Sequence, residues 1–496
     1  FIPNQLEVEK KEVSEPALNP RVLRNDGIAK TWWKKDDTFW VPRANVIVSL
    51  KAPLIDSCAE NDVKARLFSD LVRDALEEYS YDAELAGLQY NISLDSRGLC
   101  LNVSGHSDKL PMLLEQVVTT MRDVDIKEDR FEIVRERLTR GYNNWQLQSS
   151  YHQVGDYTTW LNAPERDFIV EELAAELPSI TVEGVRLFQK QMLGRLFIEV
   201  YVHGNMYHKE DALKITDMAE SILKPRTLPR AQWPVLRSLT LPRGSNYVFK
   251  KTLKDPANVN HCVQTWFYIG SRENLVVLTK TLLLHQMLKE PAFDQLHTKQ
   301  QLGCIVLSGP RVFSTTYGFR FLIQSEMTPE FLDSRIEAFL RRYVETLEKM
   351  SDAEFEGHKR SLVIRRLEKL RNLDQESSRH WSQITSEYYD FELAQRDAEQ
   401  VKKLTKSEMM EFFNKYFDPA SSERARLSIH LHAQGKTERV EKRQEEAQKK
   451  ADKDAPAGDV PSAMSTAVEI TDIRVFKANL PASSGAQPVK DSVNGL

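Results

Sequence analysis

Residues 290–311 read Glu-Pro-Ala-Phe-Asp-Gln-Leu-His-Thr-Lys-Gln-Gln-Leu-Gly-Cys-Ile-Val-Leu-Ser-Gly-Pro-Arg, and they join a predicted helix to a predicted strand through Gly303. Two side chains of this stretch, His297 and Cys304, could face one cleft. A histidine beside a cysteine can make the thiol reactive by stabilising its thiolate. The competing interpretation is structural, with His297 on the solvent side and Cys304 buried, and this arrangement is the more common one.

The elements around this stretch occur twice along the chain. Each copy has, in order, a strand, an amphipathic helix, a short connecting segment, a second strand and a second helix. The two sets lie at residues 45–50, 63–75, 85–90, 98–105 and from about 110, and at residues 263–269, 275–288, 301–306, 318–325 and from 328. A helix and a strand near 180–204 match a further pair near 404–432, so corresponding points are about 210–230 residues apart.

This repetition predicts an α+β fold of two tandem, homologous α/β-roll domains. Paired strands and long helices favour an antiparallel or mixed sheet in each domain, with helices on one face. Capping boxes at Ser351–Glu354 and Thr405–Glu408 predict two more helix starts. The predicted segments are a linker or arm at 1–28, the two domains at 29–240 and 241–435, a charged flexible tail at 436–464 and a docked C-terminal segment at 465–496.

The composition excludes several classes of protein. With 68 Lys and Arg against 72 Asp and Glu, the net charge of −4 lacks the basic excess of a nucleic-acid-binding protein. The longest apolar stretch, residues 275–284, is interrupted by Lys280 and is too short to span a bilayer. Four cysteines in 496 residues, without a Cys-x-x-Cys pair, fit a reducing compartment and predict a cytoplasmic protein. The chain starts with Phe1 rather than Met, which predicts a piece of a longer or processed protein.

The histidines do not form a recognisable metal site. None of the 11 takes part in His-x-x-x-His, His-Glu-x-x-His or His-x-x-Glu-His, the spacings that place zinc ligands on one helix face. His430 and His432 share a strand face, but no carboxylate accompanies them on that strand, which has the pattern of a domain edge. His203 and His208 have the pattern of a turn at a strand end. The sequence therefore predicts no metal ligand and no complete catalytic centre in this chain.

At residues 290–311 the sequence is similar to the insulin-degrading enzyme family, the insulysin or pitrilysin-type inverzincin zinc metalloproteases, and it resembles a fungal member. The resemblance runs along almost the whole chain. The stretches that carry it are Phe1-Ile-Pro, residues 33–42, residues 81–88, His203-Gly-Asn, residues 290–310 and residues 319–326. Such long, ordered agreement is much more specific than any short motif.

The resemblance covers only the C-terminal half of that family. It implies half of a clamshell, made of the family's third and fourth domains, with residues 1–28 as the linker between the halves. The zinc motif of the family lies in the other half. The resemblance therefore implies that this chain binds no zinc itself, is not catalytic alone, and walls the substrate chamber opposite a zinc-bearing N-terminal half that is fused to it or separate. The implied substrate is a peptide.

The resemblance also shows where this chain departs from the family. In the family an Arg and a Tyr, seven residues apart, reach across the chamber to the substrate at the zinc centre. Those positions are His297 and Cys304 here, which makes them the substrate-contacting candidates. Losing such donors to an oxyanion typically costs roughly 10²–10³ in turnover, so we expect weakened peptidase activity. The alternatives are a repurposed enzyme half that acts on a small molecule at His297 and Cys304, and a purely binding subunit.

Overall fold

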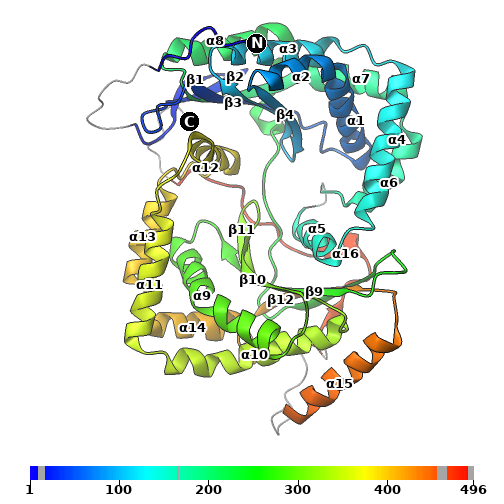
Figure 1. Cartoon of the computed structure of the whole chain (residues 1–496), viewed down its shortest axis with the longest axis vertical. Coiled ribbons are helices and arrows are strands. Elements are labelled where there is room, and N and C mark those ends of the chain that lie inside the picture. Colours follow the sequence, from blue (N-terminus) through cyan, green and yellow to red (C-terminus); the bar gives the residue numbers. More distant parts are fainter. Residues whose placement is uncertain (9–16, 165–166, 455–465, 490–496) are drawn as a thin grey trace.

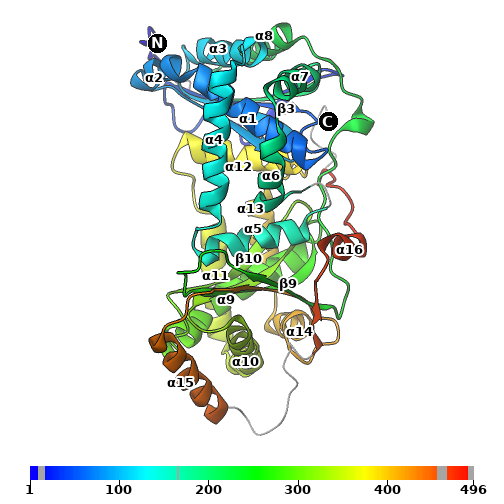
Figure 2. The same cartoon turned by 90° about the vertical axis from the view of Figure 1, so that its right-hand side faces the viewer.

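The computed structural model describes residues 1–8, 17–164, 167–454 and 466–489. It has two lobes, each built on one twisted sheet with helices packed against it (Figure 1). Turned by 90°, the molecule shows the two sheets one above the other, joined by long connections (Figure 2). The lobes correspond to the two copies of the sequence repeat.

The first sheet has β6 and β3 at its centre. Its strands are β1 (Arg21–Asn25), β2 (Ala29–Lys35), β3 (Arg43–Lys51), β4 (Gln89–Asp95), β5 (Gly98–His106), β6 (Arg195–Gly204) and β7 (Arg226–Thr227). Their order is β1-β2-β6-β3-β5-β4, with β7 beside β6. The pair β2–β6 is parallel and the other neighbours along this path are antiparallel. β1 belongs to the segment that the sequence predicted as an arm.

The second sheet repeats the topology of five of these strands. Its strands are β8 (Asn246–Thr252), β9 (His261–Ser271), β10 (Ile305–Val312), β11 (Thr316–Ser325), β12 (Ala425–His432) and β13 (Val468–Glu469), in the order β10-β11-β9-β12-β8-β13. Starting from β10, three antiparallel pairs are followed by the parallel pair β12–β8, as they are from β4 in the first sheet. The predicted α+β fold with two mixed sheets is therefore confirmed.

Helices cover one face of each sheet because alternate strand residues are apolar there. On the first sheet Val46, Val48 and Leu50 of β3 face α1 (Ala59–Ala75), α3 (Leu110–Asp123), α7 (Val182–Leu193) and α8 (Lys209–Leu223). On the second sheet α9 (Leu275–Phe293), α10 (Pro329–Lys349) and α14 (Lys406–Tyr416) do the same. The other helices are α2 (Glu77–Leu85), α4 (Glu128–Trp145), α6 (Val170–Glu176), α11 (Asp352–Arg366) and α13 (Leu393–Lys403). Both predicted capping boxes are formed, at the starts of α11 and α14.

The opposite faces carry helices that cross between the lobes. α5 (Ser150–Asn162) precedes the second lobe in sequence but packs on β9, β11 and β12. In return α12 (Leu373–Ser386), which follows the second sheet's first strands, packs on β3 and β6 of the first sheet. Each sheet thus has one helix from the other half of the chain on its second face, an exchange that the repeat did not predict.

The C-terminal part contains more regular structure than the sequence suggested. Residues 438–454 form α15 (Glu438–Asp454), where we expected a flexible charged tail. Glu, Lys, Arg, Gln and Ala are strong helix formers, and Arg443 and Gln444 attach this helix to Glu326. After residues outside the described part, β13 and α16 (Ile473–Ala478) lie against the second lobe. In the described residues no helix combines the length and apolarity that a membrane span needs.

Candidate functional site

The segment with His297 and Cys304 connects α9 to β10. After α9 the chain makes one π-helical turn, Asp294–Lys299. Gln301 then takes a left-handed conformation with φ 51°. Gly303 passes so close to β11, the strand next to β10, that an added Cβ would lie 2.0 Å from the Gln324 carbonyl oxygen. A residue without a side chain is therefore needed at this position.

In the described structure no hydrogen bond links the side chains of His297 and Cys304. His297 is half-buried and stacks on Phe293, with ring centroids 4.5 Å apart. Cys304 is exposed, unlike in the structural interpretation that had it buried. No hydrogen bond or ion pair of the described chain involves either side chain, so a histidine-activated thiolate has no geometric support here.

A buried polar cluster lies where α12 meets the first sheet. Glu376 and His380 are one turn apart on α12, and they face His203 and Lys34 from β6 and β2. The Lys34 Nζ is 2.5 Å from Glu376 Oε1, and His203 Nε2 is 3.5 Å from the same oxygen. The Nδ1 atoms of both histidines are held by hydroxyls, His203 by Ser377 at 2.6 Å and His380 by Tyr201 at 3.0 Å.

The protonation states of this cluster follow from burial. Burial opposes ionisation of Glu376, but His203 and the Lys34 ammonium outweigh it and lower the carboxyl pKa to about 2. Burial and the nearby His203 lower the pKa of His380 to about 3. Burial also lowers the pKa of His203, so both histidines are neutral at pH 7. The Nε2 of His203 faces a carboxylate, so its proton belongs on Nε2 and Nδ1 accepts from Ser377.

Two imidazoles and a carboxylate within 4.8 Å of one another are a possible metal-ligand set. The donor types suit zinc, but the cation position is already taken by the buried ammonium of Lys34, whose side chain is 1% exposed. A divalent ion would have to displace that ammonium and leave it buried without its counter-ion. The residues therefore do not fit a resident metal, and the cluster is an electrostatic clamp between α12 and the first sheet.

This cluster corrects the prediction for His203. The sequence placed His203 correctly at a strand end but favoured a turn there. His203 is the second-last residue of β6 and is fully buried. Sequence analysis also missed Lys34, Glu376 and His380. The spacing Glu376-x-x-x-His380, which places both side chains on one helix face, was a usable signal.

A second buried network lies between β12 and α10. Arg426 has 1% of its side chain exposed and contacts both Asp333 and Glu337, the latter at 3.0 Å. His430 Nε2 is 3.1 Å from Asp333 Oδ2. His432 Nε2 is 2.9 Å from Glu330 Oε1. The expectation of an edge strand is wrong, because β12 lies inside the sheet. The strand itself carries no carboxylate, as expected, but α10 supplies carboxylates across the interface.

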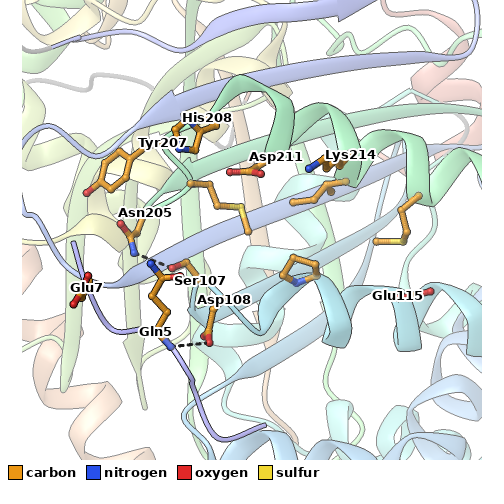
Figure 3. A pocket seen from close by; sticks show the side chains of 14 residues that line it. Gln5, Glu7, Ser107, Asp108, Glu115, Asn205, Tyr207, His208, Asp211 and Lys214 are labelled. Carbon is orange, nitrogen blue, oxygen red and sulfur yellow. Dashed lines mark hydrogen bonds between the residues drawn. The ribbon is translucent and has the colours of Figure 1, made fainter. Parts of the chain in front are cut away.

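Two of the cavities in the described structure border the first lobe. One, of about 530 Å³, is lined by α3, α8 and the N-terminal arm, with the Asp108 carboxylate accepting from the backbone N–H groups of Asn4 and Gln5 (Figure 3). Gln5 and Glu7 of the arm form part of its wall. The other, of about 800 Å³, lies between α12 and the uncovered part of the first sheet.

Comparisons with known proteins agree with this architecture. A family model described as the middle or third domain of peptidase M16 matches residues 1–176. A second, described as PQQ synthase PqqF-like, C-terminal lobe domain 4, matches residues 283–381. The putative zinc protease mug138 of Schizosaccharomyces pombe is 36% identical over 434 residues, 88% of this chain and 45% of that protein. The insulin-degrading enzyme of Homo sapiens is 33% identical over 443 residues, 87% of this chain and 42% of the enzyme.

The crystal structure of pitrilysin superimposes with a TM-score of 0.81 at 20% identity, over 98% of this chain and 48% of pitrilysin. The chain is a member of the peptidase M16 family, homologous to insulin-degrading enzyme and with the fold of pitrilysin. The resemblance seen in the sequence is therefore confirmed. The chain spans a little under half the length of these relatives.

Proposed function

We propose that this chain is the non-catalytic C-terminal half of an insulysin-like zinc metalloendopeptidase and works with a zinc-bearing half. One observation carries the proposal: the chain matches nearly half of its peptidase relatives, but its sequence has no His-x-x-Glu-His. The two lobes form half of a clamshell, and the partner half holds the zinc. This chain supplies chamber wall and substrate contacts rather than the metal.

The contact between the halves is polar and can open, because a peptide has to enter a closed chamber before it is cut. The test is to mix the chain with a zinc-bearing half at micromolar concentration. We expect co-elution in size-exclusion chromatography and peptide cleavage that appears on mixing and disappears with a chelator. Each half alone is the control. Separate elution without a gain in activity, or zinc-dependent cleavage by this chain alone, would contradict the proposal.

His297 and Cys304 are the proposed substrate-contacting residues of this half. His297→Arg with Cys304→Tyr restores a guanidinium fork and a phenol, which are stronger oxyanion donors. We expect kcat of the mixed halves to rise at least tenfold, toward the roughly 10²–10³ that one such donor is worth. Thr298→Ala on the same exposed turn is the matched control. An unchanged kcat would mean that the two positions do not contact the reacting peptide.

We also place the protein in the cytoplasm. All four cysteines are free thiols, two of them exposed, which suits a reducing compartment. Fractionation of cells that express the tagged full protein tests this location. Recovery in a secreted or organellar fraction would contradict it.

A further inference from the structure

The cavity of about 800 Å³ lies at the junction of the two lobes. Its walls are β3, β4 and β5 of the first sheet and α12. Ser314 in the β10–β11 turn and Arg272 directly after β9 complete the lining from the second lobe. Most lining residues carry a neutral hydroxyl or amide group, such as Asn45, Asn102 and Ser378. The volume lies within the range of ligand sites. Alternating hydroxyl and amide groups suit the N–H and C=O groups of a peptide better than an apolar ligand.

The charges in this cavity do not balance. Arg43, Arg97 and Arg272 line it, against Asp95 and Asp374. Asp95 is already used, since it accepts from the Arg97 side chain at 2.9 Å and from the Arg97 backbone. Asp374 accepts from the Asn45 amide at 3.0 Å. The cavity therefore has an excess of positive charge.

Arg272 carries a half-buried charge without a counter-ion, whereas Arg43, which also forms no ion pair in the described residues, is exposed to solvent. Its guanidinium lies 4.8 Å from the Tyr388 ring, and its Nη1 donates to the Phe313 and Ser314 carbonyl oxygens at 3.4 and 3.1 Å. No carboxylate in the described part of the chain forms an ion pair with it. Burial lowers the pKa of Arg272, and a half-buried guanidinium without a counter-ion gains from an anion supplied by a ligand. Its Nε and Nη2 groups remain for such a ligand.

Arg97 adds a second donor on the opposite wall. Its side chain is 4% exposed and lies over the Trp381 ring, and its Nη1 has no hydrogen-bond partner in the described structure. Arg272 and Arg97 thus approach the cavity from different lobes, the second and the first. A ligand that contacts both would bridge the lobes.

We propose that this cavity binds a carboxylate of a peptide, with Arg272 as the principal donor and the hydroxyl and amide lining bound to the peptide backbone. The peptide nature of the ligand rests on the proposed function. The substrate class that this site would select is peptides with an acidic side chain or a C-terminal carboxylate. Phosphate has similar oxyanion chemistry, and the experiment separates the two.

The test is equilibrium binding to the full 496-residue chain without a partner half. Fluorescence anisotropy would compare two labelled peptides. Both consist of Gly, Ser and Ala residues, and one carries Glu at the position where the other carries Gln. We expect the Glu peptide to bind about tenfold more tightly, and Arg272→Gln to remove this preference, because a hydrogen bond to a charged group is worth about that factor. Arg272→Lys keeps the charge and should retain part of the preference. Arg371→Gln, an exposed arginine paired with Glu368 elsewhere, is the matched control.

Equal binding of the Glu and Gln peptides, or equal losses in the Arg272→Gln and Arg371→Gln variants, would overturn the proposal. Displacement of the Glu peptide by inorganic phosphate at concentrations where acetate has no effect would assign the site to phosphate and overturn the carboxylate. Thermal melts of each variant show whether it is folded. Because no partner half is present, this result is independent of the association and cleavage that test the proposed function.

Discussion

Arg426 and Asp333 form a buried charge pair in which each side chain is 1% exposed. Removing one partner of such a pair leaves the other charged and desolvated. We predict that Asp333→Ala lowers the free energy of unfolding by about 3–5 kcal/mol, measured by urea denaturation. Glu423→Ala, which breaks an exposed pair with Arg243, should cost less than about 1 kcal/mol. Equal losses in the two variants would show that the network around Arg426 is not structural.

His380 gives the fold an acid sensitivity whose sign follows from its pKa. The pKa is about 3 in the folded protein and about 6.5 when unfolded. Between these values the unfolded chain binds the extra proton, so stability is complete above pH 6.5 and is lost as pH falls toward 3. We predict that His380→Gln reduces the loss of stability between pH 7 and pH 4.5 by roughly 2–3 kcal/mol. The exposed His152→Gln is the control, and an unchanged pH dependence in His380→Gln would contradict the prediction.

At the scale of elements, α12 holds the first sheet from the other side of the molecule. Ile384 is fully buried there with Trp32, Ile47 and Tyr201. Truncation would leave a cavity between α12 and the sheet, so Ile384→Ala should cost about 2–5 kcal/mol. Ile364→Ala on α11, where the side chain is 72% exposed, should be near neutral. Differential scanning fluorimetry and urea titration would measure both, and a neutral Ile384→Ala would mean that α12 contributes little to this face.

α5 makes the reciprocal contact on the second sheet. Its Thr158 hydroxyl is 2.6 Å from the Gln264 amide, and Ser150 donates to the Asn260 carbonyl oxygen at 2.6 Å. The two exchanged helices, α5 and α12, therefore place polar as well as apolar groups on the second face of each sheet. Without these helices that face would be exposed to water. On the first sheet, α12 likewise covers a face of β3 where Asn45, Ser49 and Lys51 are buried beside the apolar Ile47.

At the scale of the molecule, the exchange couples the two lobes. Neither sheet has both faces covered unless the other half of the chain is folded. We predict a single calorimetric unfolding transition, with a ratio of calorimetric to van't Hoff enthalpy near one. Two separated transitions would show that the lobes fold independently. Because Ile384→Ala weakens the exchange, it should split or broaden the transition more than Ile364→Ala.

The fold was predictable from local patterns and from resemblance. Apolar segments predicted β3, β9 and β11, helical periodicity predicted α1 and α10, and the offset between the copies predicted two homologous units, each with a sheet. The segment around Gly303 was recognised, although the sequence could not show that His297 stacks on Phe293 or that Cys304 is exposed. The helix α15 was missed because its charge pattern outweighed its high helix propensity in the prediction.

Sequence by itself determined the family, the α+β class, the repeat and the lack of a zinc motif, because these depend on residue order over short spans. Tertiary structure alone decided which helix covers which face and therefore which charges meet. His203 bonds Ser377 across 174 residues, and His430 meets Asp333 across 97. No spacing along the chain encodes such contacts. These contacts arise because the fold packs helices against the polar faces of the strands. The carboxylates and hydroxyls of those helices then replace the water that the buried strand side chains have lost.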